Sequence, residues 1–184
     1  LNHGYLIRDA QKRFRVSKKL LAMGCKTIGE SHFMEFSLDV MRECRDEVKE
    51  TILIGTMIEN QGVVMEQVLG SHPFKFSLDL GMRLSVHCAA PCKAMMAFMT
   101  DSEQKAILKD AVFTKHNENT ITTPAAFMKE LKEVKKCGYA LDRAEELKGI
   151  HCVSAPVFDQ YGKPIAAIWT TGPSEHLPAD KFEG

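Results

Sequence analysis

The sequence has 184 residues, a length typical of one domain with a sizeable core, and 45% of them are apolar. Its 24 basic and 24 acidic side chains give a formal net charge of zero, which argues against an extended nucleic-acid surface. No apolar run reaches the roughly 18–20 residues that cross a bilayer and no signal-peptide pattern is present, so we expect a cytoplasmic protein without membrane contact.

The N-terminal segment predicts a basic hairpin. Residues 5–7 and 14–16 favour short strands joined by a turn over residues 8–12. A lone basic hairpin is most often a solvated surface feature. Ser17 favours the start of a helix that continues through residues 20–23. Because the chain begins with leucine rather than methionine, we expect that a preceding segment has been removed.

The next part of the chain predicts a helix followed by strands. The apolar spacing over residues 31–49 suits an amphipathic helix. The runs "TILIGTMIEN" and "GVVMEQVLG" meet at residues 60–62, which favours a hairpin turn. In "FKFSLDL", residues 74–80, apolar and polar side chains alternate. This alternation predicts a strand with one solvated face.

Three helices and three strands are predicted for the remainder. One helix begins near Pro91, a second has Asp101 and Gln104 as its capping pair, and a third begins at Thr123 and ends at Gly138. A short strand over residues 139–141 precedes the two strands of "KGIHCVSAPVFDQYGKPIAAIWTTGP". The order predicts an α/β fold with a mixed, mainly antiparallel sheet and helices packed on its faces.

Motifs for catalysis and metal binding are weak. The sequence has no GxSxG, P-loop, GxGxxG or HExxH motif. His151 and Cys152 are adjacent and therefore point to opposite faces of a strand, which disfavours a cysteine nucleophile with a neighbouring base. The six cysteines are expected to be free and mostly buried thiols. A zinc site remains an alternative, although the spacing fits no standard pattern; its candidate ligands are His87, Cys88, Cys92, His151 and Cys152.

A pocket for a small ligand is the third interpretation of the last two strands. Period two places Trp169 and Thr171 on one face of one strand, and Cys152 and Ser154 on one face of the other. If the turn aligns these faces, a tryptophan, a thiol and two hydroxyls converge in the manner of a small-molecule site. The alternative is that Trp169 only fills the core. The residues alone leave these two interpretations open, because the register is not fixed by the sequence.

Taken together, the segments resemble the effector-binding domain of IclR-type bacterial transcription regulators. "GYALDRAEELKGIHCVSAPVFDQYGKPIAAIWTTGP" is similar to that family's signature, and "GMRLSVHCAAPCKAMMAFM" to its "G-x-R-L-P-L-H-x-x-A-x-G-K-A-x-L-A" segment. "VKETILIGTMIENQGVVMEQV" resembles the first sheet hairpin of the family, and "GYLIRDAQKRFRVSKKLLAMG" resembles the wing of a winged helix-turn-helix with its linker helix. The resemblance covers nearly the whole chain, with several motifs in the right order.

The resemblance implies a GAF-like fold and a regulatory function. It implies a remnant of the wing at residues 1–16, a linker helix at 17–30 and the effector-binding domain at 31–184. The chain would then be the sensing half of a homodimeric or homotetrameric regulator that is not an enzyme and has no cofactor. It would contact DNA only through the absent N-terminal domain. Binding of a small organic acid would be coupled allosterically to DNA affinity.

The family's pocket also implies a set of ligand-binding residues in this sequence. The positions of polar contact are Asp142, Cys152, Trp169 and Thr171. The positions of the apolar wall are Phe76 and Leu84, and those of the anion-holding loop are Ala90 and Pro91. Three departures from the family pattern matter: Pro91 lacks an N–H, Cys92 replaces a glycine, and Trp169 replaces a small hydroxyl residue. They favour a planar or larger organic acid over an acid of two or three carbons.

Two alternatives to the sensor remain. The first is a cysteine-based redox or metal sensor, or an enzyme, on a GAF-like fold that uses Cys152 or Cys92. A depressed thiol pKa would favour it, because reactivity follows the thiolate fraction. The second is a structural oligomerisation domain whose cavity is filled.

Overall fold

The computed structural model describes residues 6–8, 12–16 and 31–178 of the chain. The chain divides into two compact units, Leu1–Val40 and Met41–Gly184. In the first unit, strands β1 (Leu6–Arg8) and β2 (Phe14–Val16) pair antiparallel, with Ile7 opposite Arg15. The predicted N-terminal hairpin is therefore confirmed, whereas the helix expected over residues 17–30 lies outside the described residues. Helix α2 (Ser31–Val48) begins in the first unit and ends in the second. The apolar spacing over residues 31–49 predicted this helix.

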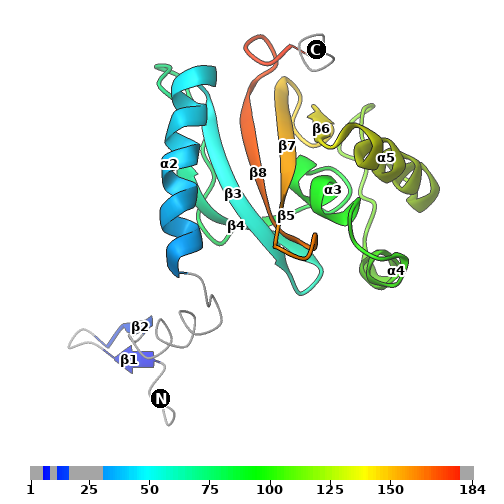
Figure 1. Ribbon diagram of the computed structural model, residues 1–184, viewed down its shortest axis with the longest axis horizontal. Helices are drawn as coiled ribbons and strands as arrows, with labels where there is room; N and C mark the ends of the chain where they lie inside the picture. Colours follow the sequence, from blue (N-terminus) through cyan, green and yellow to red (C-terminus); the bar gives the residue numbers. More distant parts are fainter. Residues whose placement is uncertain (1–5, 9–11, 17–30, 179–184) are drawn as a thin grey trace. The chain divides into compact units, whose positions relative to one another are not determined.

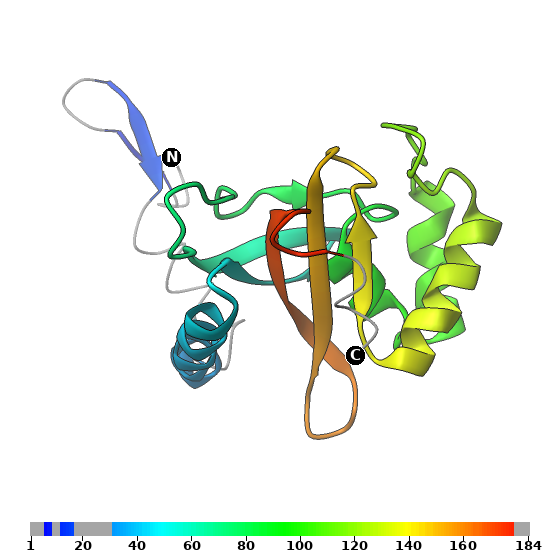
Figure 2. The ribbon, with the colours of Figure 1, turned by 90° about the horizontal axis from the view of Figure 1, so that it is seen from above.

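The second unit is built on a six-stranded sheet in the order β5-β4-β3-β8-β7-β6 (Figures 1 and 2). Its strands are β3 (Thr51–Ile58), β4 (Gln61–Val68), β5 (Arg83–Leu84), β6 (Ala140–Arg143), β7 (Ile150–Phe158) and β8 (Pro164–Pro173). Every neighbouring pair is antiparallel, so the expected mainly antiparallel α/β fold is confirmed. Because β8 pairs with β3, the β7–β8 hairpin joins the β3–β4 hairpin in the middle of the sheet.

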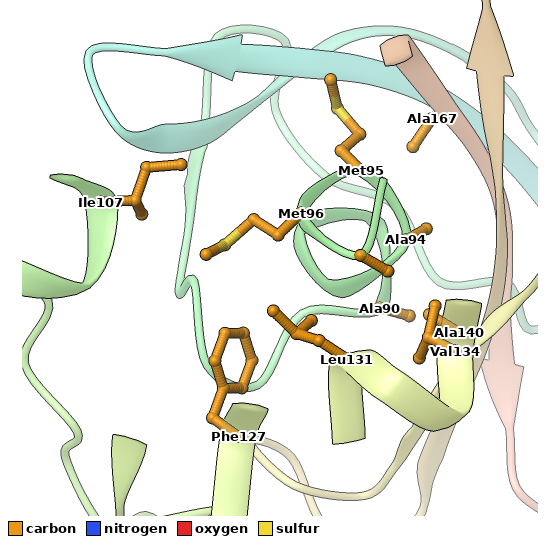
Figure 3. Close-up of a cluster of buried hydrophobic side chains, with 11 residues drawn as sticks. Ala90, Ala94, Met95, Met96, Ile107, Phe127, Leu131, Val134, Ala140 and Ala167 are labelled. Atoms are coloured by element: carbon orange, nitrogen blue, oxygen red, sulfur yellow. The ribbon is translucent and has the colours of Figure 1, made fainter. Parts of the chain in front are cut away.

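Three helices cover one side of this sheet (Figures 1 and 2). They are α3 (Ala90–Met96), α4 (Asp101–Asp110) and α5 (Pro124–Cys137). Every residue of α3 is buried, because α3 lies between the strands and α5. Figure 3 shows Ala94 of α3 and Ala167 of β8 among the core side chains, with Phe127 and Leu131 of α5 closing the other side. The small alanines let the helix lie close to the sheet.

Helix ends follow local chemistry, with one correction. Thr123 caps α5 by accepting a hydrogen bond from the Ala126 N–H, and Gly138 ends the helix in the left-handed conformation, both as predicted. The capping box of α4 is formed by Thr100 and Glu103, not by Asp101 and Gln104. The reason is that Gln104 is buried, and its side chain donates a hydrogen bond of 2.7 Å to the Met96 carbonyl instead.

Two strand predictions are wrong in detail. The β3–β4 turn is centred on Glu59 and Asn60, which both have positive φ, one residue earlier than predicted. Residues 74–80 form a loop, and the edge strand β5 follows it. The alternation is nevertheless present, since Phe76 and Leu78 are half-buried between exposed neighbours. The backbone of the loop bonds to side chains rather than to a neighbouring strand.

Candidate functional site

A cavity of about 210 Å³ lies between β7, β8, the start of α3 and the loop over residues 76–84. All eight residues selected from the sequence line it: Phe76, Leu84, Ala90, Pro91, Asp142, Cys152, Trp169 and Thr171. Seven further lining residues were not selected from the sequence: Leu78, Met82, Arg83, Ala89, Glu146, Leu147 and Ile150. The structure thus brings together, around one cavity, positions that are up to 95 residues apart in the chain, from Phe76 to Thr171.

The β7–β8 pairing forms the polar part of the cavity wall. Cys152 lies directly opposite Thr171, and its thiol donates to the Thr171 hydroxyl at 3.1 Å. Ser154 lies opposite Trp169, so the predicted alignment of the two faces is confirmed. Only one of the two expected hydroxyls reaches the cavity, however. Ser154 is fully buried and donates to the Ile168 carbonyl at 3.1 Å.

Trp169 belongs both to the core and to the cavity wall. Its side chain is 3% exposed and packs with Leu53 and Val64. Gly55 on the adjacent strand makes room for the indole ring, since a Cβ there would lie 3.1 Å from Trp169 Cη2 and 2.4 Å from the Val63 carbonyl oxygen. Trp169 therefore packs in the core and also borders the cavity, so the interpretation in which it only fills the core is wrong. Ligand binding by this cavity stays a prediction.

Asp142 places a carboxylate at the cavity where β6 ends. One of its oxygens, Oδ1, accepts a hydrogen bond of 2.7 Å from the Glu145 N–H, which fixes the side chain. Burial raises the pKa of Asp142 above its ordinary value, and this hydrogen bond and the Lys93 charge act in the opposite direction. The group therefore offers the cavity a strong acceptor of hydrogen bonds from a ligand.

A buried ion pair lies next to Asp142 and was not found from the sequence. The ammonium group of Lys93, on α3, is inaccessible to solvent and contacts the Glu145 carboxylate and, at 2.9 Å, the Leu141 carbonyl. Burial raises the pKa of Glu145 to about 7, although Lys93 lowers it. One sequence signal was available: Lys93 stands in the run "AAPCKAMMAFM", where its neighbours on every helical face are small or apolar.

The loop that carries Phe76 and Leu78 is fastened to the sheet by side chains. The Thr51 hydroxyl donates to the Phe76 carbonyl at 2.6 Å and accepts from the Gly70 N–H at 3.1 Å. The Gln67 side chain donates to the Leu78 carbonyl at 2.7 Å and accepts from its N–H at 3.2 Å. These bonds replace the strand ladder that the alternating pattern predicted.

The start of α3 faces the same cavity with Ala90 and Pro91. The N–H of Ala90, the first helical residue, has no partner inside the helix, whereas Pro91 has no N–H to offer. The α3 end of the cavity therefore provides fewer backbone donors than a helix start with two N–H groups. Arg83, which also lines the cavity, is the one basic residue among its lining residues.

Three cysteines of the second unit have the properties of structural thiols. Burial raises the pKa of Cys88, Cys92 and Cys152 to about 12 in each case. A reactive cysteine requires a lowered pKa, because the thiolate is the nucleophile. This disfavours the redox and cysteine-enzyme alternatives.

The candidate zinc ligands do not converge as one set. The donor atoms of His87, Cys88 and His116 lie within 4.8 Å of one another, beside a second cavity of about 460 Å³. His87 Nε2 is already 2.9 Å from the Thr114 carbonyl. His151 contacts the Leu177 carbonyl through Nδ1 at 2.8 Å, on the face opposite Cys152.

Comparison with known proteins identifies the family. Residues 25–183 match the family profile described as the bacterial transcriptional regulator IclR C-terminal domain. The chain belongs to the IclR family. It is 25% identical to the transcriptional regulator KdgR of Escherichia coli over 181 residues, which is 98% of this chain and 69% of KdgR. The chain matches smaller parts of other curated relatives, such as 53% of the E. coli repressor IclR.

Solved structures of IclR-family proteins have the same fold as this chain. The Thermotoga maritima IclR structure superimposes with a TM-score of 0.79 at 28% identity, covering 99% of this chain and 74% of that protein. A homologue from Microbacterium hydrocarbonoxydans, complexed with 4-hydroxybenzoate, shares the fold at 18% identity with a TM-score of 0.78, covering 94% and 71%.

The family membership confirms the fold class and the regulatory assignment inferred from the motifs. The relatives are transcription regulators rather than enzymes, and the chain is an effector-binding domain of that family. In the part of the chain that the structure describes, no helix is both long and apolar enough to span a bilayer.

Proposed function

We propose that the 210 Å³ cavity binds a planar organic acid that carries at least one hydroxyl group, and that this ligand is the effector of the regulator. The observation that carries the proposal is the arrangement of the cavity wall. Trp169 borders the cavity next to the polar pair of Cys152 and Thr171, with Asp142 at its side. Apolar walls with a few placed polar groups are typical of small-molecule sites.

The size of the cavity supports a single substituted ring. An apolar cavity of about 150 Å³ in a protein core accommodates benzene. The present cavity is larger, at about 210 Å³, and is smaller than the roughly 300 Å³ at which sites for drug-sized ligands begin. A ring with a carboxylate and a hydroxyl group therefore fits the volume, and the ring gains stacking contact with the indole.

The charges of the lining residues favour a ligand with both donors and an anionic group. Asp142 and Glu146 are acidic, so they favour a hydroxyl that donates a hydrogen bond. The carboxylate of the ligand is complemented by the Ala90 N–H, and Arg83 adds a positive charge at the cavity wall while its guanidinium pairs with Glu59 at 3.2 Å and donates to Gln61. A small anion without a hydroxyl group would face two acidic side chains with little apolar contact in return. This is why the planar hydroxy acid is preferred.

We also propose that effector binding is coupled to DNA affinity through a helix-turn-helix domain outside this sequence. The basic hairpin β1–β2 is consistent with the wing of such a domain, and the intact regulator is proposed to be a homodimer or homotetramer in the cytoplasm. Sequence-specific DNA binding by this chain alone is not expected, because sequence is read by a recognition helix.

Thermal unfolding of the chain with a panel of organic acids tests the effector proposal. A ligand present at about 100 times its dissociation constant stabilises the folded state by about 2.7 kcal/mol, which for a chain of this size is a shift of roughly 5–10 °C. We expect this shift with 4-hydroxybenzoate or a related hydroxylated aromatic acid and not with acetate or pyruvate.

Two variants complete this test. Trp169→Ser should abolish the shift, whereas Tyr161→Ala, which changes a side chain that is 85% exposed and does not line the cavity, should preserve it. If only the two- and three-carbon acids shifted the transition, or if Trp169→Ser responded like the wild type, the planar-acid proposal would be wrong.

A further inference from the structure

A second group of chemically active side chains lies outside the effector cavity. Glu50 immediately precedes β3, His72 follows β4, and His176 follows β8. One oxygen of Glu50, Oε1, is 2.5 Å from His176 Nδ1 and 3.5 Å from His72 Nε2. The two imidazole rings face each other with centroids 4.6 Å apart. One donor atom from each residue lies within 4.8 Å of the other two.

The buried carboxylate of Glu50 is only partly hydrogen-bonded. The Glu50 side chain is 1% exposed, and its second oxygen, Oε2, has no hydrogen-bond partner within the described residues. Oε2 lies against β8, where a Cβ on Gly172 would come within 2.6 Å of it. Burying a carboxylate costs free energy unless its oxygens are hydrogen-bonded or bound to a metal, and Oε2 meets neither condition within the described residues. A cation bound beside Glu50 would compensate the buried carboxylate.

The three segments are held in place by their backbones. The Ser71 N–H donates to the Lys49 carbonyl at 2.9 Å, which places the His72 segment beside Glu50. Gly70 allows this close approach, since a Cβ there would lie 2.8 Å from the Lys49 carbonyl oxygen. The turn that carries His176 is closed by the His176 N–H, which donates to the Pro173 carbonyl at 2.9 Å. The backbone therefore holds the three segments side by side, which brings the three donor side chains together.

We propose that Glu50 Oε1, His72 Nε2 and His176 Nδ1 bind a divalent transition metal ion, with zinc as the best match. Two imidazoles and one carboxylate form a known zinc donor set, with bonds of about 2.0–2.2 Å and ligand atoms roughly 3.3 Å apart in a tetrahedron. The 3.5 Å between Glu50 Oε1 and His72 Nε2 already fits this geometry. The 2.5 Å between Glu50 Oε1 and His176 Nδ1 is a hydrogen-bond distance and must widen by roughly 1 Å. The metal then replaces the proton that the two atoms share, and this proton passes to solvent.

The exposure of the ligands permits both this adjustment and entry of the ion. The His72 and His176 side chains are each 38% exposed, whereas Glu50 is buried beneath them. Because the rings are partly exposed, the imidazoles have room to move outward by the roughly 1 Å that metal binding requires. The open side leaves the fourth position to water. A bound ion would join the start of β3 to the segments that follow β4 and β8.

Metal titration of the untagged chain tests this site. The protein is stripped with a chelator, desalted and titrated with Zn²⁺ by calorimetry and with Co²⁺ by visible absorption. We expect one ion per chain and a cobalt d–d spectrum without a near-ultraviolet sulfur-to-cobalt band, because the site has no thiolate.

Conservative variants assign the ion to the cluster. His72→Gln and His176→Gln should each weaken binding by about 100-fold or more, exceeding the 10–100-fold typical of outer-shell changes. His116→Gln is the matched control, since His116 belongs to the other histidine cluster, and it should bind as the wild type does. Far-UV circular dichroism checks that each variant is folded.

Three results would overturn the proposal. The first is Zn²⁺ binding weaker than about 100 μM in the wild type. The second is wild-type affinity in both folded histidine variants at positions 72 and 176. The third is a sulfur-to-cobalt band together with loss of binding in His116→Gln, which would assign the ion to His87, Cys88 and His116. None of these outcomes depends on the identity of the effector.

Discussion

Replacing Trp169 by alanine should destabilise the domain by about 3 kcal/mol, the lower end of the 3–5 kcal/mol that burial of such a side chain contributes. The side chain is 3% exposed and packs against Leu53 and Val64, so its removal deletes core contacts. The lower end applies because part of the ring already borders the 210 Å³ cavity and has no packed neighbour there. For a chain of this length, 3 kcal/mol corresponds to a fall in Tm of roughly 6–12 °C.

Guanidinium titration followed by far-UV circular dichroism measures this loss without relying on tryptophan fluorescence. The matched control is Tyr161→Ala, which truncates an aromatic side chain that is 85% exposed and should change the free energy of unfolding by no more than about 0.5 kcal/mol. A loss below about 1 kcal/mol for Trp169→Ala, or one no larger than that of the control, would refute the packed position of the indole ring.

Three further predictions concern the surroundings of the cavity. Gly55→Ala should destabilise the domain by about 1–3 kcal/mol and shift the Trp169 emission, because the new methyl group would collide with the Val63 carbonyl and the indole. Unchanged stability and emission would contradict the close approach of Gly55 to the Trp169 ring. Thr51→Val should cost about 1–3 kcal/mol and speed amide exchange in residues 70–80, because the hydrogen bonds of the hydroxyl to the Phe76 carbonyl and from the Gly70 N–H are lost. Unchanged exchange would show that Thr51 does not hold this segment. Burial raises the pKa of Glu145 from 4.5 to about 7, so the folded chain keeps a proton that the unfolded chain loses as the pH rises above 4.5. The stability from this group is therefore fully present below pH 4.5 and is lost as the pH rises through 7. In urea titrations, the unfolding free energy of the wild type minus that of Glu145→Gln should fall by on the order of 3 kcal/mol between about pH 4.5 and 7.5. Curves that stay parallel over this range would contradict the raised pKa of Glu145.

Features set by neighbouring residues were predicted well from the sequence. Thr123 and Gly138 mark the ends of α5 because capping depends on side chains and backbone angles within one turn. The shared faces of β7 and β8 follow from the two-residue period of a strand once the connecting turn is short. The cavity-lining positions came from the family resemblance rather than from periodicity, since nothing local joins Phe76 to Asp142.

Features that depend on distant partners were missed. Residues 74–80 have the alternation of a strand, but Thr51 and Gln67 bond to the backbone of the loop and fix it without a ladder. The Lys93–Glu145 pair joins residues 52 positions apart, and its cost or benefit depends on burial that no local pattern records. The cluster of Glu50, His72 and His176 likewise arises only when three strand ends meet.

Fluorescence titration with 4-hydroxybenzoate is the most direct test of the central claim, because Trp169 is the single tryptophan of the chain. We expect a saturable change in the intensity or wavelength of the Trp169 emission, with one ligand bound per chain and a Kd that matches calorimetry. Calorimetric binding of the same acid that leaves the Trp169 emission unchanged would contradict the proposed site, because the ligand would then lie away from the indole.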